Sequence, residues 1–505
     1  MKTENLKIAI IAPEIFPLAK TGGLADVCSA LAKNLALLGH QVKVILPKYK
    51  NLDEGLYNLT SVNTPSLKIT LGPQVESVQV KSCQLPDSSV ECFLISCDKY
   101  FARDGMYQDP TTGLDYPDND ERFILFSKAA LEALKAVGFQ PDVINPHEYQ
   151  SALVPVFLKT IYQKDSFFKS TGSVFTIQNV AYQGNYPKES LAKLGLPTEL
   201  ASEKNKFEHK GKLCFLKAGI LYADALTTVS ETYAVEIQST HDFGYGLEDV
   251  VRQRNLDLYG ILNGVDETEW SPETDPLIPY NYSKDDLSGK KKNKQRLWEK
   301  CGFVPVHPDP DKSGERVNLE IPVLGIISRL VEQKGLDLLE EIAEDLFAMD
   351  VKLVLLGTGD KKYEKALADL EKKYSKKFKC FFSFDDKLAH LIEAGSDIYL
   401  MPSRYEPCGL NQMYSLKYGT VPVVRYSGGL ADTIENFDPK KNSGTGFVFM
   451  HYDPLEFLEA VRRAVETYKN KNVWEGLMRR GMEKDFSWRK AAEKYVEVFR
   501  LARKE

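Results

Sequence analysis

Two cations follow an apolar segment in the second half of the chain. Arg329 and Lys334 come after Val323–Ile327, in a loop that leads into a stretch with helical spacing. Fixed cations at the end of a strand can neutralise a departing diphosphate, because preorganised positive charge stabilises negative charge that develops in the transition state. A surface charge pair would give the same pattern. The spacing alone therefore leaves both interpretations open.

A carboxylate and two glycine turns follow the later apolar segments. Glu406 comes after Asp397–Met401, and a carboxylate at a strand end can act as a base, a nucleophile or a hydroxyl acceptor. Gly409–Asn411 then begins a predicted helix, whose first N–H groups lack intrahelical partners and can hold a phosphate. We interpret Gly428–Gly429 as a second place where the backbone can approach a ligand.

A further glycine pair stands near the N-terminus, in the segment Lys20-Thr21-Gly22-Gly23. It lies between a predicted strand and a predicted helix, where exposed N–H groups and the helix terminus favour an anion. A plain turn from strand to helix would also explain a Gly-Gly pair.

Short β-branched runs separated by helical stretches must position these residues. A helix is predicted over Leu24–Leu38, ended by Gly39. The strands that we predict in the first half of the chain are Ile8–Ala12, Val42–Leu46, Val143–Asn145, Ser173–Gln178 and Ala225–Val229. This alternation indicates an α/β doubly wound domain.

The same alternation restarts after a polar stretch. Residues 271–320 are rich in Pro, Lys, Asp and Asn and show no clear period, and Lys290–Lys294 is predicted to be a solvated loop. The strands predicted beyond it are Val323–Ile327, Lys352–Leu356, Asp397–Met401 and Val421–Val424. Two Rossmann-like units therefore suggest a cleft between two domains, with ligands at the carboxyl ends of the strands.

Composition excludes several classes of protein. The chain has 505 residues and a net charge of -6, so no overall nucleic-acid footprint is expected. No apolar run is long enough to span a bilayer or to form a signal peptide, and the eight cysteines include no Cys-x-x-Cys pair. We expect a cytoplasmic protein without a metal site, and we interpret the acidic pairs Asp309-Pro310-Asp311 and Asp385-Asp386 as surface loops.

Ordered motifs along nearly the whole chain resemble those of bacterial glycogen synthases and plant starch synthases. The motifs are Lys20-Thr21-Gly22-Gly23-Leu24-Ala25-Asp26, Tyr182-Gln183-Gly184, Phe215-Leu216-Lys217-Ala218-Gly219, Asn263-Gly264-Val265-Asp266 with Trp270 and Pro272, Ser328-Arg329-Leu330 with Gln333-Lys334-Gly335, Pro402-Ser403-Arg404-Tyr405-Glu406-Pro407-Cys408-Gly409-Leu410, Gly428-Gly429-Leu430-Ala431-Asp432-Thr433 and Asp485-Phe486-Ser487-Trp488.

The resemblance implies the GT-B fold, in which two Rossmann-like doubly wound domains face each other across a cleft. The boundaries that we assign are 1–262 for the N-terminal, acceptor-side domain, completed by a C-terminal helix over 486–505, and 263–485 for the nucleotide-sugar-binding domain. The resemblance also implies a retaining transfer of glucose from ADP-glucose or UDP-glucose to the non-reducing end of an α-1,4-glucan such as glycogen.

The resemblance assigns roles to individual residues. It makes Arg329 and Lys334 the phosphate-binding pair and Glu406 a partner of the glucose hydroxyls. Phe384 stands where the family often has an aromatic residue that stacks on the nucleobase, although an isolated Phe is more often part of a core. The remaining expected catalytic residues are Gln178 and Glu148, and the remaining donor-binding residues are Lys20, Gly22, Gly23, Tyr107, Asn263, Gln333, Cys408, Gly409, Leu410, Asn411, Gly428 and Gly429.

Departures from the family pattern keep a second function open. Gln178 replaces a His, His147-Glu148-Tyr149-Gln150 replaces His-Asp-Trp-His, and Asn411 replaces a Ser or Thr, a change that a helix-capping Asn would make mild. A weakly catalytic or non-catalytic glucan-binding homologue is the alternative. Retention of Lys20, Arg329, Lys334 and Glu406 favours the enzyme, because a glucan binder needs no diphosphate site. A phosphorylase or an epimerase fits the sequence less well.

Overall fold

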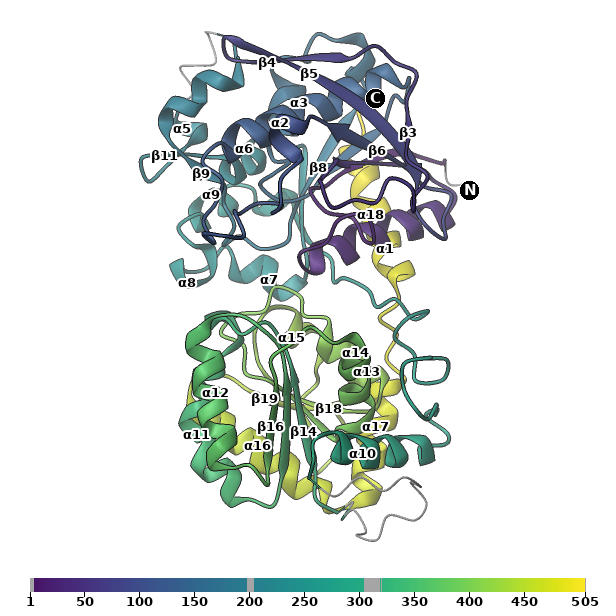
Figure 1. Cartoon of the computed structure of the whole chain (residues 1–505), viewed down its shortest axis with the longest axis vertical. Coiled ribbons are helices and arrows are strands. Elements are labelled where there is room, and N and C mark those ends of the chain that lie inside the picture. Colours follow the sequence, from purple (N-terminus) through teal and green to yellow (C-terminus); the bar gives the residue numbers. More distant parts are fainter. Residues whose placement is uncertain (1–3, 198–203, 304–317, 319, 505) are drawn as a thin grey trace. The chain divides into compact units, whose positions relative to one another are not determined.

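A computed structural model describes residues 4–197, 204–303, 318 and 320–504 of the chain. They form two compact units, one of Met1–Gly264 with Trp488–Glu505 and one of Val265–Ser487. Each unit is an α/β structure built around its own sheet (Figure 1). None of the helices in the described part of the chain combines the length and apolar character that crossing a membrane requires.

The first unit is built on a mostly parallel sheet. Its strand order is β13 (Leu258–Gly260), β12 (Ala225–Thr228), β8 (Gly172–Ile177), β7 (Val143–Pro146), β1 (Lys7–Ile11), β2 (Gln41–Pro47), β6 (Glu91–Ser96), β5 (Gln74–Gln84) and β3 (Thr60–Ser61), with β4 (Leu67–Leu71) paired to β5. Strands from β13 to β6 are parallel, and β5 is antiparallel to β6, β3 and β4. A small separate sheet joins β10 (Glu208–His209), β11 (Lys212–Cys214) and β9 (Asn185–Tyr186).

Helices cover this sheet, and one of them comes from the far end of the chain. The C-terminal helix α18 (Trp488–Ala502) packs against α1 (Gly23–Leu37) and β8. The other helices are α2 (Asp98–Phe101), α3 (Asn119–Ala136), α4 (Leu153–Lys159), α5 (Lys204–Phe207), α6 (Phe215–Tyr222), α7 (Glu231–Glu236), α8 (His241–Gly244) and α9 (Glu248–Arg252).

The second unit has a wholly parallel sheet. Its strand order is β16 (Phe378–Phe381), β15 (Lys352–Leu356), β14 (Val323–Ile327), β17 (Ile398–Met401), β18 (Val421–Arg425) and β19 (Phe447–Phe449). This is the doubly wound order, in which the chain moves outward from β14 in one direction and then returns to continue in the other.

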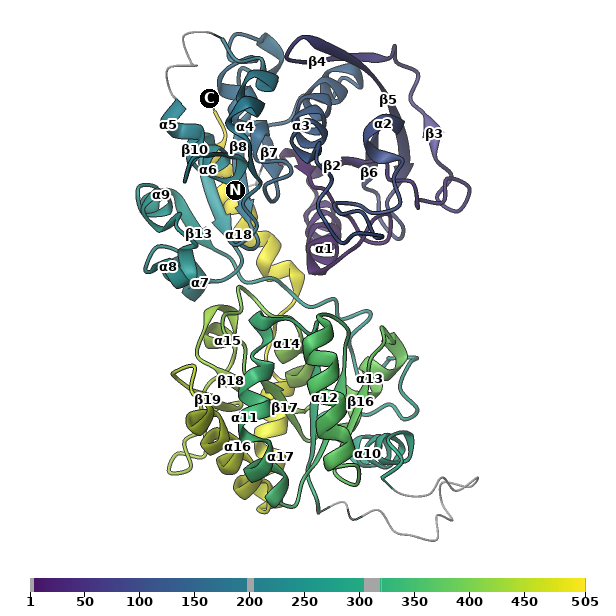
Figure 2. The ribbon, with the colours of Figure 1, turned by 60° about the vertical axis from the view of Figure 1, so that its left-hand side comes forward.

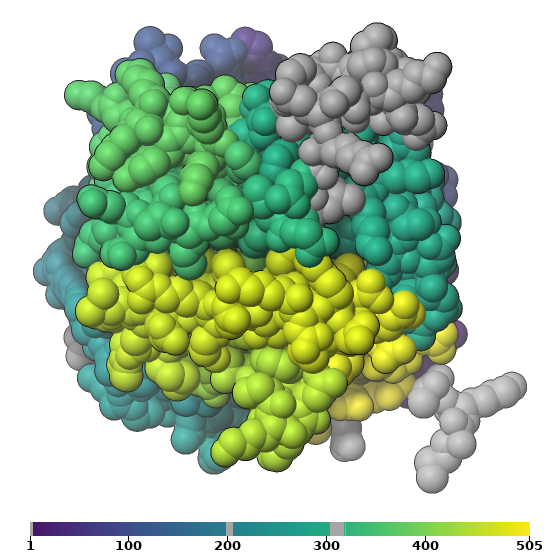
Figure 3. Space-filling view, turned by 90° about the horizontal axis from the view of Figure 1, so that it is seen from below, coloured from purple at the N-terminus to yellow at the C-terminus, as the bar shows by residue number. Residues whose placement is uncertain are grey.

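Helices flank both faces of the second sheet (Figures 1 and 2). On one face lie α11 (Leu336–Ala348), α12 (Lys361–Lys373) and α16 (Pro454–Tyr468), and on the other lie α10 (Ser288–Lys300), α13 (Asp386–Gly395) and α14 (Asn411–Lys417). The short helix α15 (Gly428–Thr433) follows β18. The last helices of the unit, α16 and α17 (Lys471–Met482), form the yellow band across the face shown in Figure 3. Buried apolar residues of the strands and the facing helices make the core.

The predicted α/β class and the predicted strands are confirmed. Both β14 and β15 match the predicted ends, and the other predicted strands overlap observed ones within one residue or two at each end. The predicted helix over Leu24–Leu38 is α1. The sequence predicted these segments because each strand is a short, mostly buried apolar run between polar turns.

The prediction for the polar stretch was wrong. Ser288–Lys300 forms α10, and Lys290 and Lys294 are 4% exposed rather than solvated. Lys290 Nζ donates to Thr420 Oγ1 at 2.7 Å, and Lys294 Nζ lies 2.7 Å from Asp397 Oδ2. The two lysines are one helical turn apart and therefore face the same way. Their buried acceptors lie far away in the sequence and hold these two lysines inside the unit, whereas Lys291 and Lys292 of the same run are exposed.

Candidate active site in two halves

The candidate residues gather where each sheet reverses its strand order. In the first unit β1 lies between β2 and β7, and in the second β14 lies between β15 and β17. Ligands of doubly wound sheets bind outside the carboxyl ends of the strands at such a reversal. Most predicted residues follow these strands or their neighbours: Lys20, Gly22 and Gly23 after β1, Glu148 after β7, Gln178 after β8, Arg329, Gln333 and Lys334 after β14, Glu406, Cys408, Gly409, Leu410 and Asn411 after β17, and Gly428 and Gly429 after β18.

A buried carboxylate that the sequence analysis missed organises the first half-site. Glu14 is 3% exposed and follows β1. Its carboxylate accepts bonds from the Thr21 N–H at 2.5 Å, the Thr21 hydroxyl at 2.6 Å and the Gly22 N–H at 3.3 Å. It also accepts a bond of 2.7 Å from the Tyr107 hydroxyl. Its place just beyond a strand end was the only signal in the sequence, because the partners that make it important are distant or are main-chain atoms.

Some N–H groups of the turn at Thr21–Gly23 are therefore already bonded to Glu14 and do not face a ligand. The N–H of Gly22 is bonded to Glu14, whereas α1 begins at Gly23, and both glycines have open space where a side chain would be. Lys20 Nζ lies 2.8 Å from Asp26 Oδ1 and 4.9 Å from the centre of the Phe16 ring. This is a half-exposed cation beside the start of a helix, an arrangement that suits an anionic ligand.

Gln178 is bonded to a buried histidine of defined tautomer. His147 Nε2 lies 2.9 Å from Asn145 Oδ1, so this nitrogen donates and Nδ1 is the acceptor. Gln178 Nε2 lies 3.2 Å from His147 Nδ1 and donates to it. Burial lowers the pKa of His147 to about 3, so the imidazole is neutral at ordinary pH. One amide hydrogen of Gln178 is thus engaged, and the other remains available to a ligand.

Glu148 supports the main chain next to Gln178. Its Oε1 accepts bonds from the N–H of Gln178 at 2.6 Å and from that of Asn179 at 2.9 Å. Burial, opposed by these two bonds, raises the pKa of Glu148 to about 8. The residue adopts a φ of 64°, a left-handed conformation that costs energy for a residue with a side chain and that often occurs at functional sites.

Two other predicted positions in this unit are buried. Gln150 is 5% exposed and Asn263 is 4% exposed. Within the described residues, neither Gln150 Oε1 nor Asn263 Oδ1 has a hydrogen-bond partner. Unsatisfied buried oxygens are uncommon and invite a ligand or an ordered water.

A compact ion pair forms the centre of the second half-site. Lys334 Nζ lies 2.6 Å from Glu406 Oε2, and that oxygen also accepts a bond of 3.0 Å from the Ser403 hydroxyl. The neighbouring Gln333 donates from Nε2 to the Tyr405 carbonyl at 3.2 Å. The structure therefore brings the loops after β14 and β17 together, which the sequence predicted only through the resemblance. Arg329 follows β14 as well and is exposed.

Glycines allow these loops to meet. Gly335 has a φ of 68°, and a Cβ at this position would lie 1.9 Å from the Pro402 carbonyl oxygen. A Cβ on Gly428 would lie 2.1 Å from the Glu406 carbonyl oxygen, and the Gly429 N–H donates to that oxygen at 3.1 Å. Gly428–Gly429 was predicted to approach a ligand. What these two glycines approach closely in the structure is the turn at Glu406 of the same chain.

A buried side chain hydrogen-bonds to the turn that follows Glu406. The buried side chain of Gln412 donates to the carbonyls of Cys408 and Gly409, each at 3.0 Å, and Leu410 is the residue that precedes α14. Asn411 does not cap this helix as predicted. Its Nδ2 donates instead to the Ile327 carbonyl at 2.8 Å and to the Tyr399 hydroxyl at 2.7 Å, which ties α14 to the end of β14.

Phe384 is not a core residue. It follows β16, and its side chain is 88% exposed. The alternative that the sequence analysis kept for an isolated Phe, burial in a core, is therefore excluded.

One group of described residues has the composition of a metal site. The possible ligand atoms of Glu269, Asp386 and His390 lie within 4.8 Å of one another. His390 Nδ1 is 2.8 Å from Asp275 Oδ2, and its ring stacks on Trp270 at 3.8 Å. Asp385-Asp386 is not the predicted surface loop, because Asp385 caps α13 and Asp386 is the first residue of that helix. The predicted surface loop at Asp309–Asp311 lies outside the described residues.

Comparison with known protein families finds one matching family model in each half of the chain. Residues 7–253 match the model of the starch synthase catalytic domain, and residues 309–476 match that of glycosyl transferases group 1. With two doubly wound sheets and candidate groups at each strand reversal, these matches define a two-domain glycosyltransferase of the GT-B class.

Full-length relatives narrow this class. The chain is 45% identical to the glycogen synthase of Koribacter versatilis over 99% of its own length and 98% of the relative's, and 41% identical to that of Thermotoga maritima over 98% and 99%. A solved structure, the catalytic domain of starch synthase IV from Arabidopsis thaliana bound to ADP and acarbose, superposes with a TM-score of 0.87 at 30% identity and covers 99% of both chains. The chain belongs to the glycogen synthase and starch synthase family.

Proposed function

We propose that this glycosyltransferase moves glucose from ADP-glucose or UDP-glucose to the non-reducing end of an α-1,4-glucan, with retention at the anomeric carbon. The observation that carries the proposal is the Lys334–Glu406 pair, which joins the loops after β14 and β17; the exposed Arg329 lies in the first of these loops. A cation next to a carboxylate at a strand reversal suits a donor that carries both a diphosphate and a hydroxylated sugar.

The second unit supplies the groups for the leaving diphosphate. Arg329 and Lys334 neutralise the charge that develops as the glycosidic bond breaks, and Glu406 accepts hydrogen bonds from the glucose hydroxyls. The backbone of Gly409–Asn411 binds the distal phosphate, and Phe384 stacks on the nucleobase. The 88% exposure of Phe384 supports this last assignment.

The first unit supplies the groups for the sugar. The acceptor 4-hydroxyl attacks the anomeric carbon on the face that the nucleotide leaves, and its proton passes to the leaving diphosphate. The carbonyl of Gln178 stabilises the positive charge on the glucose ring, a role that needs only the main chain. Glu148 is then a positioning residue, because its carboxylate holds the N–H groups of Gln178 and Asn179.

The starch synthase IV structure was solved with ADP and acarbose, which favours ADP-glucose as the donor here. The test is to incubate the purified protein with glycogen and either ADP-glucose or UDP-glucose, and to measure nucleotide release together with glucan growth. We expect the glucan to grow with retention of the anomeric configuration. Binding of glycogen without turnover from either donor would contradict the proposed enzymatic activity and identify the weakly catalytic or non-catalytic glucan-binding homologue. We place the reaction in the cytoplasm, in keeping with eight cysteines that are all free and buried.

A further inference from the structure

The residue Tyr107, which faces Glu14, lies in a long segment without helix or strand. This segment, residues 102–118, connects α2 to α3. A loop of this length inside a compact unit is usually functional, and it needs specific contacts to hold one conformation. The contacts that hold it are therefore part of the half-site, although the sequence motifs did not point to them.

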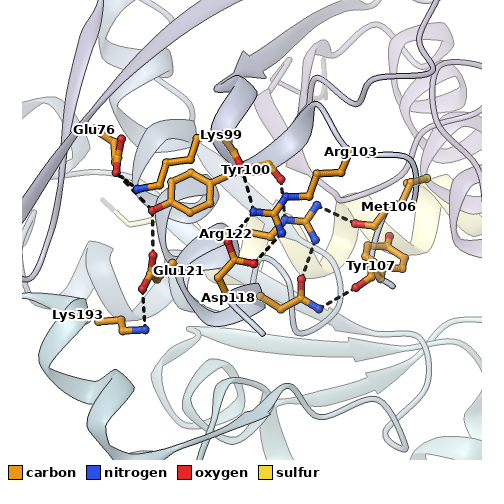
Figure 4. Close-up of polar contacts among 11 residues, drawn as sticks. Glu76, Lys99, Tyr100, Arg103, Met106, Tyr107, Asp118, Glu121, Arg122 and Lys193 are labelled. Carbon is orange, nitrogen blue, oxygen red and sulfur yellow. Dashed lines mark hydrogen bonds and ion pairs between the residues drawn. The ribbon is translucent and has the colours of Figure 1, made fainter. Parts of the chain in front are cut away.

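One buried guanidinium group binds a main-chain carbonyl of this loop and another just before it (Figure 4). Arg122 donates from Nε to the Tyr100 carbonyl at 2.7 Å and from Nη2 to the Met106 carbonyl at 2.9 Å. It also donates from Nη1 to Asn119 Oδ1 at 2.7 Å, and Asn119 Nδ2 donates in turn to the Tyr107 carbonyl at 2.9 Å. A planar group with donors in fixed directions can bind several carbonyls at once. Arg122 thus binds the Met106 carbonyl directly and the Tyr107 carbonyl through Asn119, and the Tyr107 carbonyl also accepts the Tyr116 N–H at 3.2 Å.

The charge of Arg122 is held in an aromatic cage. The side chain is 0% exposed, and its guanidinium lies 5.2 Å from the Tyr116 ring, 5.5 Å from the Phe123 ring and 5.6 Å from the Phe101 ring. Burial lowers the pKa of Arg122 from its usual value. Burying a charge is costly, and apolar residues of the same volume often stabilise a fold better. The retained cation therefore points to a requirement for the loop's conformation beyond simple stability.

The same chain of contacts leads on to the glycine turn. The Tyr107 hydroxyl donates to Glu14 at 2.7 Å. Glu14 holds the N–H groups of Thr21 and Gly22 through its other bonds. The ring of Tyr107 also packs at 6.2 Å on that of Phe123, one wall of the cage. Displacement of the Met106–Tyr107 main chain would therefore reach the start of α1 through two bonded side chains.

We propose that Arg122 is a positioning residue for sugar transfer: it fixes the Met106–Tyr107 main chain and, through Tyr107 and Glu14, the turn before α1. This inference rests on the proposed function and on the expectation, from the family resemblance, that Tyr107 binds the donor. It assigns Arg122 no contact with the substrate. Its effect should fall mainly on the chemical step and less on nucleotide binding, because most of the groups that we assign to the diphosphate lie in the second unit.

Matched variants separate this role from a general structural one. Arg122→Lys keeps the charge but loses the planar donors. Asn119→Asp keeps the acceptor for Arg122 but loses the donor to the Tyr107 carbonyl. Arg103→Lys is the control, because Arg103 belongs to the same loop and is paired with Asp118 at 2.6 Å but has no bond to the Met106–Tyr107 main chain in the described contacts.

The measurements are kcat with a nucleotide-glucose and glycogen, the affinity for the free nucleoside diphosphate, and amide hydrogen exchange. Arg122→Lys and Asn119→Asp should lower kcat by roughly ten- to a hundredfold, as expected when reacting groups are misplaced by about 1 Å. Affinity for the diphosphate should fall by a smaller factor than kcat, and exchange should rise in residues 103–118 and 20–23. Arg103→Lys should keep wild-type kcat. In a Tyr107→Phe background, Arg122→Lys should cause little further loss.

Other results would overturn the inference. Unchanged kcat in folded Arg122→Lys would do so, and so would exchange that rises equally across the whole first unit, or losses that multiply fully in the Tyr107→Phe background. If Arg122→Lys does not fold, Asn119→Asp decides by the same measures. If the wild type transfers no glucose, the proposed function fails by itself, and the exchange data still show whether Arg122 orders the loop and the turn.

Discussion

The two half-sites occupy the same kind of place in two sheets, but they use charge in opposite ways. After β1 and β7 the first unit has two buried acidic side chains, Glu14 and Glu148, whose oxygens accept main-chain N–H groups. After β14 the second unit has two cations, the exposed Arg329 and Lys334, which pairs with Glu406 from the loop after β17. A carboxylate that collects N–H groups fixes backbone geometry, whereas a cation at a loop can meet an incoming anion. The first half-site is therefore built for position and the second for charge.

The largest expected effect tests the charge side of this comparison. Arg329→Ala and Lys334→Ala should each lower kcat by about 10²–10³, because each removes a preorganised contact to the developing charge of the leaving group. Steady-state kinetics measures the loss, and a thermal melt checks the fold. Lys361→Ala is the control, since Lys361 is 90% exposed and pairs only locally with Glu364. Near-normal turnover in both folded site variants would rule out the assignment.

The positioning role of the first half-site can be tested through the protonation of Glu148. Glu148 is buried with a pKa of about 8, above the value of 4.5 for an exposed Glu. Between these two pKa values the folded protein keeps a proton on Glu148 that the unfolded chain has lost. The contribution of this protonated side chain to the free energy of unfolding is therefore present at low pH and is lost as pH rises through about 8. Glu148→Gln should flatten this slope, by at most about 1.4 kcal/mol per pH unit. The measurement is the melting temperature as a function of pH.

The second unit offers a matched control for that experiment. Glu393 is buried in α13, accepts a bond of 2.7 Å from the Ser415 hydroxyl, and has a pKa that burial also raises to about 8. Glu393→Gln should flatten the pH dependence of stability similarly. Only Glu148→Gln should also lower kcat, by about fivefold for one weakened hydrogen bond of roughly 1 kcal/mol. Equal effects of the two variants on kcat would contradict the positioning role.

A smaller effect is expected at Gln178, where the chain departs from its family. The amide donates to His147 and has a second hydrogen for a sugar hydroxyl. Gln178→Ala should cost roughly 0.5–1.5 kcal/mol in transfer, the range of a neutral hydrogen bond, and Gln178→His should be active with little gain. The exposed amide Gln140 provides a control through Gln140→Ala. An inert wild type that Gln178→His restores would identify a degenerate homologue.

The sequence predicted what depends on local pattern. β14 and β15 were located to the residue because they are short apolar runs with polar ends. Arg329, Lys334 and Glu406 could be placed after strands for the same reason. What failed depends on distant partners: Lys290 and Lys294 are buried because Thr420 and Asp397 receive them, and Glu14 matters because Tyr107 and a turn converge on it. The type of a residue does not reveal which distant residues it contacts in the folded chain.

The smallest expected effect is that of a chelator, which should leave turnover unchanged. If Arg329 and Lys334 hold the diphosphate, no divalent ion is needed to neutralise it, whereas enzymes that bind diphosphate through Mg²⁺ aim carboxylates at it. Glu269, Asp386 and His390 are the described residues whose composition suits a metal, and none of them belongs to the predicted site. An ion held there would be seen in the melting of the second unit and not in kcat. Turnover measured with and without EDTA decides the matter, since complete loss that Mg²⁺ or Mn²⁺ restores would contradict the role of the two cations.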